Sequence, residues 1–136
     1  MKPVPTLTYD DAVRAVRACH DKASQLHAAV AIAVVDAGGG VIALTRMDGA
    51  RPYTVDLATR KARTATAIGI DTAVLQQHLG SSPLSAEVLA VPGGLPCVEG
   101  SMPAGGIGIS GALPEVDVLI AQAGIDAIRT AMEAGR

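Results

Sequence analysis

An uninterrupted apolar run at residues 29–35 (Ala-Val-Ala-Ile-Ala-Val-Val) limits the folds that this chain can adopt. The run is too short and too rich in β-branched residues for a good helix, and its lack of polar alternation indicates a strand covered on both faces. Glycines fill residues 38–40, where they supply the positive φ angles of a tight hairpin, and residues 41–47 then return as a second strand. The sequence therefore predicts a sheet built around a buried central strand.

Helical periodicity and turn residues place the other elements. Thr8 followed by Asp11 resembles a capping box, so a helix is predicted to begin near Tyr9. On this helix, Tyr9, His20 and His27 are expected to share the apolar stripe. Helices are predicted over residues 9–26, 53–68, 71–79 and 114–134, further strand segments over 89–91, 96–98 and 104–110, and a loop over 80–83.

The apolar side chains of this chain are small. It has no Trp, no Phe and only two Tyr, but 15 Gly. Such a core packs by close approach of backbones, because it has no aromatic anchors. Gly105, Gly106 and Gly108 remove bulk from the last strand, so another backbone or a flat ligand can approach it closely.

The order of the elements predicts the fold class. Helix, hairpin, helices, hairpin and helix follow one another without the regular strand–helix–strand units of a doubly wound sheet. We expect an α+β fold with a mostly antiparallel sheet of about five strands packed with helices, in a single domain over residues 1–136. On the last helix, Leu113 and Val116 begin the side predicted to face the core.

Charge and composition exclude several classes of partner. The chain has 11 Lys and Arg against 13 Asp and Glu, a net charge of −2, and no basic run, so we expect no nucleic-acid binding. No apolar run approaches the ~20 residues of a membrane span, and the amino terminus lacks an apolar export segment. We expect a cytoplasmic protein that does not enter membranes, and whose cysteines, Cys19 and Cys97, are reduced thiols.

Motifs spread along the chain occur together in a known protein family. They are Val-Val-Asp-Ala-Gly-Gly at residues 34–39, Arg-Met-Asp-Gly-Ala at 46–50, Lys-Ala-Arg-Thr-Ala at 61–65, and a run from Pro-Gly-Gly-Leu-Pro at 92–96 to Gly-Ile-Gly-Ile-Ser-Gly at 106–111. In order and spacing they cover nearly the whole chain. The chain thereby resembles the GlcG-like or HbpS-like family, also called haem-degrading, to which the carboxy-terminal domain of PduO-type corrinoid adenosyltransferases belongs.

The resemblance implies an antiparallel α/β domain that assembles into dimers or larger homo-oligomers. The biochemical role of the family is less fixed: some relatives bind haem, some are linked to its breakdown, and others accompany catabolic pathways. Haem-binding relatives recruit a histidine of the first helix, which points to His20 as the metal ligand, with His27 next along the stripe. Haem is thus a possible cofactor. The alternative is that both histidines are hydrogen-bonded residues near the helix end.

The chain departs from the family pattern in two places. Cys97 stands where the family usually has a branched aliphatic residue. After Pro114 the family tends to show a denser acidic cluster, of which Glu115 and Asp117 remain here. These departures put a role for the acidic cluster in doubt.

Charged residues of the hairpin and the middle helix are candidates for a polar site. Asp36 ends the buried strand, where burial can tune the pKa of a carboxylate, or where the carboxylate can bond the amides of the turn. Arg46 and Lys61 could together grip a carboxylate, or pair with Asp36 or Asp48. Because such groups can transfer protons, Asp36, Lys61 and Asp117 are the candidate catalytic residues.

Candidate ligand contacts come from the glycine-rich run and from Arg46. The amides of Ser110 and Gly111 precede the last helix and could receive an anionic group. The remaining candidates in that run are Gly93, Gly94 and Pro96.

Three functions remain open from the sequence. The first is a small-molecule-binding homo-oligomer, with pockets between the Asp36 hairpin, the Lys61 helix and the glycine-rich strand, and a tetrapyrrole or carboxylated metabolite as ligand. The second is a cofactor-independent enzyme, an isomerase, lyase or hydrolase, that uses Asp36, Lys61 or Asp117 for proton transfer. The third is a structural partner that stabilises another enzyme.

Overall fold

A computed structural model describes residues 1–80 and 88–135 of the chain. In chain order the elements are α1 (Tyr9–Gln25), β1 (Ala31–Asp36), β2 (Val41–Arg46), α2 (Thr54–Ile68), α3 (Thr72–Leu79), β3 (Gly94–Glu99), β4 (Met102–Ser110) and α4 (Pro114–Glu133). Residues 81–83 of the predicted loop lie outside the described residues. No helix in the described ranges is long and apolar enough to cross a membrane.

The strands form one antiparallel sheet in the order β2-β1-β4-β3. Strand β1 pairs with β2 on one side and with β4 on the other, which confirms the predicted central strand. The described residues contribute four strands, so the expected fifth strand at residues 89–91 is wrong. There the Leu89 amide donates to the Thr64 hydroxyl, and the Val91 carbonyl accepts a hydrogen bond from the Thr72 hydroxyl. Side chains of α2 and α3 thus bind the backbone groups that a strand partner would have used.

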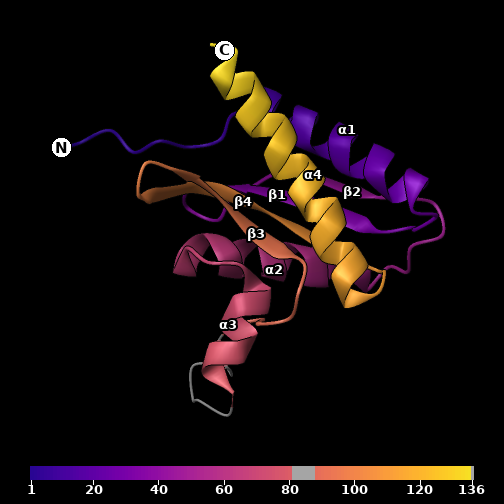
Figure 1. Ribbon diagram of the computed structural model, residues 1–136. Helices are drawn as coiled ribbons and strands as arrows, with labels where there is room; N and C mark the ends of the chain where they lie inside the picture. The colour runs from indigo at the N-terminus through magenta and orange to yellow at the C-terminus, as the bar shows by residue number, and fades with distance from the viewer. Residues whose placement is uncertain (81–87, 136) are drawn as a thin grey trace.

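Helices cover both faces of the sheet (Figure 1), which makes β1 buried on each side. Ile32 and Val34 point into the cluster formed with α1 and α4, whereas Ala31, Ala33 and Val35 pack against α2. Burial on both faces explains why the strand carries no polar residue before Asp36. The α+β class and the antiparallel sheet predicted from the sequence are confirmed.

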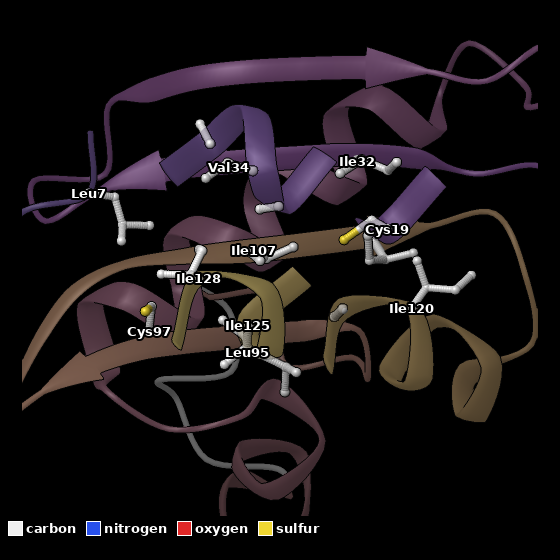
Figure 2. Packing of buried hydrophobic residues seen from close by; sticks show 14 of the residues in the cluster. Leu7, Cys19, Ile32, Val34, Leu95, Cys97, Ile107, Ile120, Ile125 and Ile128 are labelled. Carbon is white, nitrogen blue, oxygen red and sulfur yellow. The ribbon is translucent and has the colours of Figure 1, made fainter. Parts of the chain in front are cut away.

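The larger core lies between the sheet and the helices α1 and α4 and is entirely aliphatic apart from two thiols (Figure 2). Its largest side chains are isoleucines, among them Ile107 and Ile128, which are fully buried. Cys19 and Cys97 are buried in this cluster and form no disulfide, as expected for the predicted reduced thiols. Burial raises the pKa of the Cys19 thiol to about 12, so this cysteine stays protonated and unreactive in the folded protein.

On the opposite face, the backbone of α2 lies directly against the glycines of β4. A Cβ atom at Gly108 would overlap the carbonyl oxygen of Ala58, and one at Gly106 would overlap the hydroxyl of Thr66. The sequence left open whether another backbone or a flat ligand approaches this strand. In the structure it is the backbone of α2 that approaches the strand closely, and it fills the space that side chains at these glycines would occupy.

Helix α1 begins as predicted but presents a narrower apolar stripe than expected. The Thr8 hydroxyl accepts from the Asp11 amide at 3.2 Å and the Asp11 carboxylate accepts from the Thr8 amide at 2.8 Å, which is the predicted capping box. The expectation that Tyr9, His20 and His27 lie on the apolar stripe is wrong, because all three side chains are exposed. Small side chains at the buried positions bring α1 close to its neighbours, so only a thin strip of its surface is covered; these positions include Ala12, Ala15, Cys19 and Ala23.

The close contact between α2 and β4 predicts that Gly108→Ala destabilises the fold strongly. The added methyl group meets backbone atoms of Ala58 and Ala62, which cannot rotate away, so we expect a loss of about 3 kcal/mol in the free energy of unfolding. Gly38→Ala is the matched control, because its Cβ would meet nothing closer than 3.6 Å and its change should stay within about 0.5 kcal/mol. Urea unfolding followed by circular dichroism measures both. Equal stability of the two variants would contradict the packing described here.

Candidate functional site

A buried ion pair joins the middle helix to the last helix. Lys61 lies on the face of α2 that packs against the sheet, and Asp117 lies in the first turn of α4. The Lys61 Nζ atom stands 3.3 Å from Asp117 Oδ2 and donates to the carbonyl oxygen of Ile109 at 2.8 Å. Both side chains are 4% exposed. The structure therefore pairs two of the three candidate catalytic residues with each other, and Lys61 with neither Asp36 nor Asp48.

The second carboxylate oxygen of Asp117 holds the segment that enters α4. Asp117 Oδ1 accepts a hydrogen bond of 3.0 Å from the amide of Ala112. The carboxylate thus bridges a buried ammonium group and a backbone amide. Both contacts involve an ionised partner, which strengthens them relative to neutral hydrogen bonds.

Two glycines predicted as ligand contacts cover this pair instead. A Cβ atom at Gly93, whose φ is +123°, would lie 2.6 Å from the Ile109 oxygen and 3.0 Å from Lys61 Nζ. At Gly94 it would overlap the backbone of Lys61. Both glycines and the neighbouring Pro96 are buried. These glycines therefore allow the chain to close over the ammonium group, and they leave no room at these positions for a ligand beside it.

Burial disfavours the charged form of both partners. Loss of solvation lowers the pKa of Lys61 from its ordinary value, and the negative charge of Asp117 counteracts this effect. Loss of solvation likewise raises the pKa of Asp117, against the opposing effects of Lys61 and of the Ala112 amide. The pair therefore stores unfavourable desolvation energy that its mutual attraction offsets only in part.

The Asp36 carboxylate binds backbone amides in the turn of the first hairpin. Its Oδ1 atom accepts from the amides of Gly38 at 3.0 Å and Gly40 at 2.9 Å, which is the structural alternative considered for it. On β1 it pairs with Gly105, whereas Ile109, the partner of Lys61, pairs with Ile32. Four residues of strand separate these positions, or about 13 Å. The prediction that Asp36 and Lys61 converge on one cavity with the glycine-rich strand is wrong.

Arg46 and Ser110 lie on either side of the central strand. Both pair with Ala31, Arg46 from β2 and Ser110 from β4. Arg46 is exposed and Ser110 is buried. Lys61 Nζ binds the Ile109 carbonyl and Asp117 instead, and two strand spacings, about 10 Å, separate Arg46 from β4, so the structure does not bring Arg46 and Lys61 into contact with each other.

A cavity of about 400 Å³ lies where three chain segments meet at one end of the sheet. The antiparallel order brings together the turn before β1, the loop after β2 and the loop after β4. The cavity is lined by Leu26, His27, Ala28, Ala29, Gly49, Gly111, Ala112, Leu113 and Val116. His27 is the one lining residue with a polar side chain, but exposed polar groups make the surface of the cavity about as polar as it is apolar. Its volume is within the usual range for small-molecule sites.

The imidazole in this wall belongs to a residue with an unusual backbone conformation. His27 has φ 55° and is the only described non-glycine residue with positive φ. Its amide donates to the Ser24 carbonyl and the Ala28 amide donates to the Ala23 carbonyl, so α1 ends in a Schellman motif. Glycine usually occupies this left-handed position, and a side chain there costs about 1 kcal/mol. His27 therefore carries its imidazole at a position where stability favours glycine.

His20, the histidine ranked first from the sequence, stands on the open surface of α1. Its side chain is 53% exposed, and Nδ1 lies 3.9 Å from the Asp21 carboxylate. His78 is also exposed, and its Nδ1 contacts the carbonyl of Val74 within α3. No group of three or more His, Cys, Asp or Glu that could hold a metal ion occurs in the described ranges.

Sequence reasoning missed part of the cavity wall. Leu113 was expected on the covered side of α4 but is 64% exposed, at the rim of the cavity together with the partly exposed Leu26. Gly49 and Gly111 carry the signal that could have located it. Both have positive φ, and a Cβ atom at either would approach Ala29, so these loop glycines let the segments converge on the turn after α1.

The buried pair predicts an unequal response to single and double substitution. Lys61→Met leaves the Asp117 carboxylate buried without its counterion, which should cost about 3–5 kcal/mol of unfolding free energy. Lys61→Met combined with Asp117→Asn removes both charges and keeps an oxygen for the Ala112 amide, so most of that loss should be recovered. Urea unfolding measures both variants. A double variant no more stable than Lys61→Met would contradict this account of the pair.

The pKa shifts also predict how the pair affects stability as pH changes. Folded Asp117 keeps its proton above its ordinary pKa of 3.8, so the difference in unfolding free energy between wild type and the double variant should fall as pH rises above that value. Folded Lys61 releases its proton below 10.5, so the difference should rise again as pH approaches 10.5. Urea unfolding of wild type and the double variant over this pH range tests whether the difference in their unfolding free energies has a minimum between these two pH ranges. A difference that does not change with pH would contradict this prediction.

Solved structures of proteins with related sequences have the same fold as this chain. The Streptomyces reticuli HbpS structure, a double mutant, is 34% identical, with a TM-score of 0.87 over 93% of this chain and 89% of that chain. A crystal structure of a PduOC:heme complex is 32% identical, with a TM-score of 0.84 over 90% of this chain and 94% of that chain.

Sequence comparison agrees with these structures. The corrinoid adenosyltransferase PduO of Salmonella typhimurium is 33% identical over 130 residues, which are 90% of this chain and 39% of that protein. The chain thus spans about two fifths of this longer relative. The family described as "Haem degrading protein HbpS-like" matches residues 7–126. The chain belongs to the HbpS-like family.

Proposed function

We propose that this protein binds a tetrapyrrole, with haem as the first candidate, and that His27 supplies the axial ligand to the iron. The observation that carries the proposal is that His27 lines a cavity of about 400 Å³ whose other lining side chains are all apolar. The PduOC relative that is solved as a heme complex supports haem over other flat ligands.

The residues around the cavity suit such a group. A neutral imidazole nitrogen is a common axial ligand of haem iron. Leu26, Leu113 and Val116 offer aliphatic surface to a flat apolar molecule, and the lining residues include no acidic side chain. When bound, haem would supply a redox-active iron centre, while His27 would hold the iron and the apolar wall would limit the access of water.

The backbone strain at His27 also supports its assignment as a ligand-binding residue. A left-handed non-glycine residue persists only where the surrounding structure holds it, and such residues are frequent at binding sites. Glycine at this position would relieve the strain and lose the imidazole. Glycine at this position would therefore favour stability, whereas ligation of the iron requires histidine.

His20 remains the alternative ligand predicted from the sequence. Its imidazole is accessible, but His20 does not line the cavity at His27. A haem on this surface of α1 would need further cover, which a second copy of the chain could provide. We also propose that the chain self-associates, because large apolar side chains, among them Tyr53 and Leu119, are exposed on the described surface.

Proton transfer without a cofactor is the second candidate from the sequence. The pairing of Lys61 with Asp117, with the pKa of each shifted toward neutrality, is the observation in its favour. Both groups are buried beneath Gly93, so a substrate would reach them only after the chain above them moves. The cavity at His27 therefore carries the stronger proposal.

Haemin titration tests the assignment of His27. Wild type should develop a saturable Soret band, and His27→Gly should bind at least about tenfold more weakly, since the iron loses its ligand. The same substitution should hold or raise the free energy of unfolding by up to about 1 kcal/mol, because glycine favours the left-handed conformation. This opposite change separates a lost ligand from a damaged fold.

His20→Ala and His78→Ala are the matched controls and should bind haemin as wild type does. Loss of the Soret band in His20→Ala, with binding intact in His27→Gly, would move the iron ligand to His20. A wild-type protein that gives no Soret band would remove haem as ligand and favour the proton-transfer candidate. Light scattering of the haem-free samples tests self-association, which a monomeric mass would contradict.

A further inference from the structure

The loop from Gly111 to Leu113 forms one wall of the His27 cavity, and at its end the Leu113 carbonyl accepts hydrogen bonds from the amides of Val116 and Asp117 in the first turn of α4. Gly111 has φ +130° and no side chain, and Leu113 is 64% exposed. Between them, the amide of Ala112 donates to Asp117 Oδ1. This hydrogen bond connects the cavity wall to a buried group.

That buried group is itself fixed from a distant part of the chain. Asp117 Oδ2 faces the Nζ atom of Lys61, which reaches it from α2 and also binds the carbonyl of Ile109. Ile109 is the penultimate residue of β4, two positions before the loop. One ammonium group therefore sets the position of the strand end and, through Asp117, the position of the Ala112 amide.

Stability alone does not explain why charged groups fill this position. Two buried charges lose their hydration, and well-packed apolar residues of similar volume often stabilise a protein equally or better. A carboxylate does what an aliphatic side chain cannot, because its two oxygens bind the ammonium group and the backbone amide together. The benefit of the pair thus lies in the geometry that it imposes on the loop.

We infer that Lys61 and Asp117 are positioning residues for the ligand cavity: through the hydrogen bond to its amide they hold Ala112 in place in the wall that His27 also lines. The inference deepens the proposed function and rests on it for the identity of the ligand. The placement of the wall itself can be measured without any ligand.

Two double variants separate positioning from general stability. Lys61→Met/Asp117→Asn keeps an oxygen that accepts from the Ala112 amide, whereas Lys61→Met/Asp117→Leu offers none. Neither carries a buried charge, and the leucine variant should fold at least as stably as the asparagine variant. A difference between them therefore reports on the hydrogen bond to the wall.

The asparagine variant lacks the ammonium group but keeps an acceptor for the Ala112 amide, so it should bind haemin more weakly than wild type. The leucine variant lacks both and should bind about tenfold more weakly than the asparagine variant, with a shifted Soret maximum. Amide hydrogen exchange of Ala112, measured by NMR without ligand, should stay slow in the asparagine variant and become fast in the leucine variant. Equal haemin affinity in the two variants, or equal protection of Ala112, would overturn the inference.

The ligand-free measurement distinguishes failure of this inference from failure of the proposed function. If wild type binds no haemin, the proposed function fails, and the exchange of Ala112 together with the ring signals of His27 decides the inference. Changes in these signals that are confined to the leucine variant support the positioning role. Unchanged signals in both variants refute it.

Discussion

The contact between the backbone of α2 and the bare backbone of β4 determines where the buried charged side chains of the candidate site lie. Without Cβ atoms at Gly106 and Gly108, the helix approaches until its own carbonyl groups rest on the strand. Only at this distance does the ammonium group of Lys61 reach the Ile109 carbonyl and the Asp117 carboxylate. A larger residue on the strand would move the helix outward and separate these charges in a medium where an unpaired charge is costly.

Two groups in this structure oppose stability in different ways. The buried pair bears a desolvation penalty, and His27 bears backbone strain. Both lie at the end of the sheet where the cavity opens, one behind its wall and the other within it. The aliphatic core on the α1 and α4 side supplies the stability that allows these features to persist.

The sequence predicts the fold well where a local signal and a tertiary requirement agree. The unbroken apolar run becomes the central strand, and Thr8 with Asp11 forms the capping box. The expected strand at residues 89–91 fails because the hydroxyls of Thr64 and Thr72, far away in sequence, bind its backbone. Hydrogen bonds between a side chain and a backbone group distant in sequence produce no periodic pattern from which they could be predicted.

The site is predicted less completely than the fold. Lys61 and Asp117 were identified, but Asp36 was grouped with them although its carboxylate binds the turn amides. Helical periodicity placed His20 and His27 on the stripe because it assumes an apolar face of ordinary width. The alanine-rich surface of α1 packs so closely that the covered strip is narrower. The position of the His27 side chain depends on a left-handed helix end, a conformation that residue type alone would have assigned to glycine.

The lack of aromatic residues has a consequence for spectroscopy. The chain has no Trp, and its two tyrosines, Tyr9 and Tyr53, are 69% and 61% exposed. Intrinsic fluorescence and near-ultraviolet absorbance therefore come from groups that are already hydrated in the folded state, and they report poorly on folding. The same weak background leaves the visible and near-ultraviolet bands of a bound chromophore almost free of protein signal.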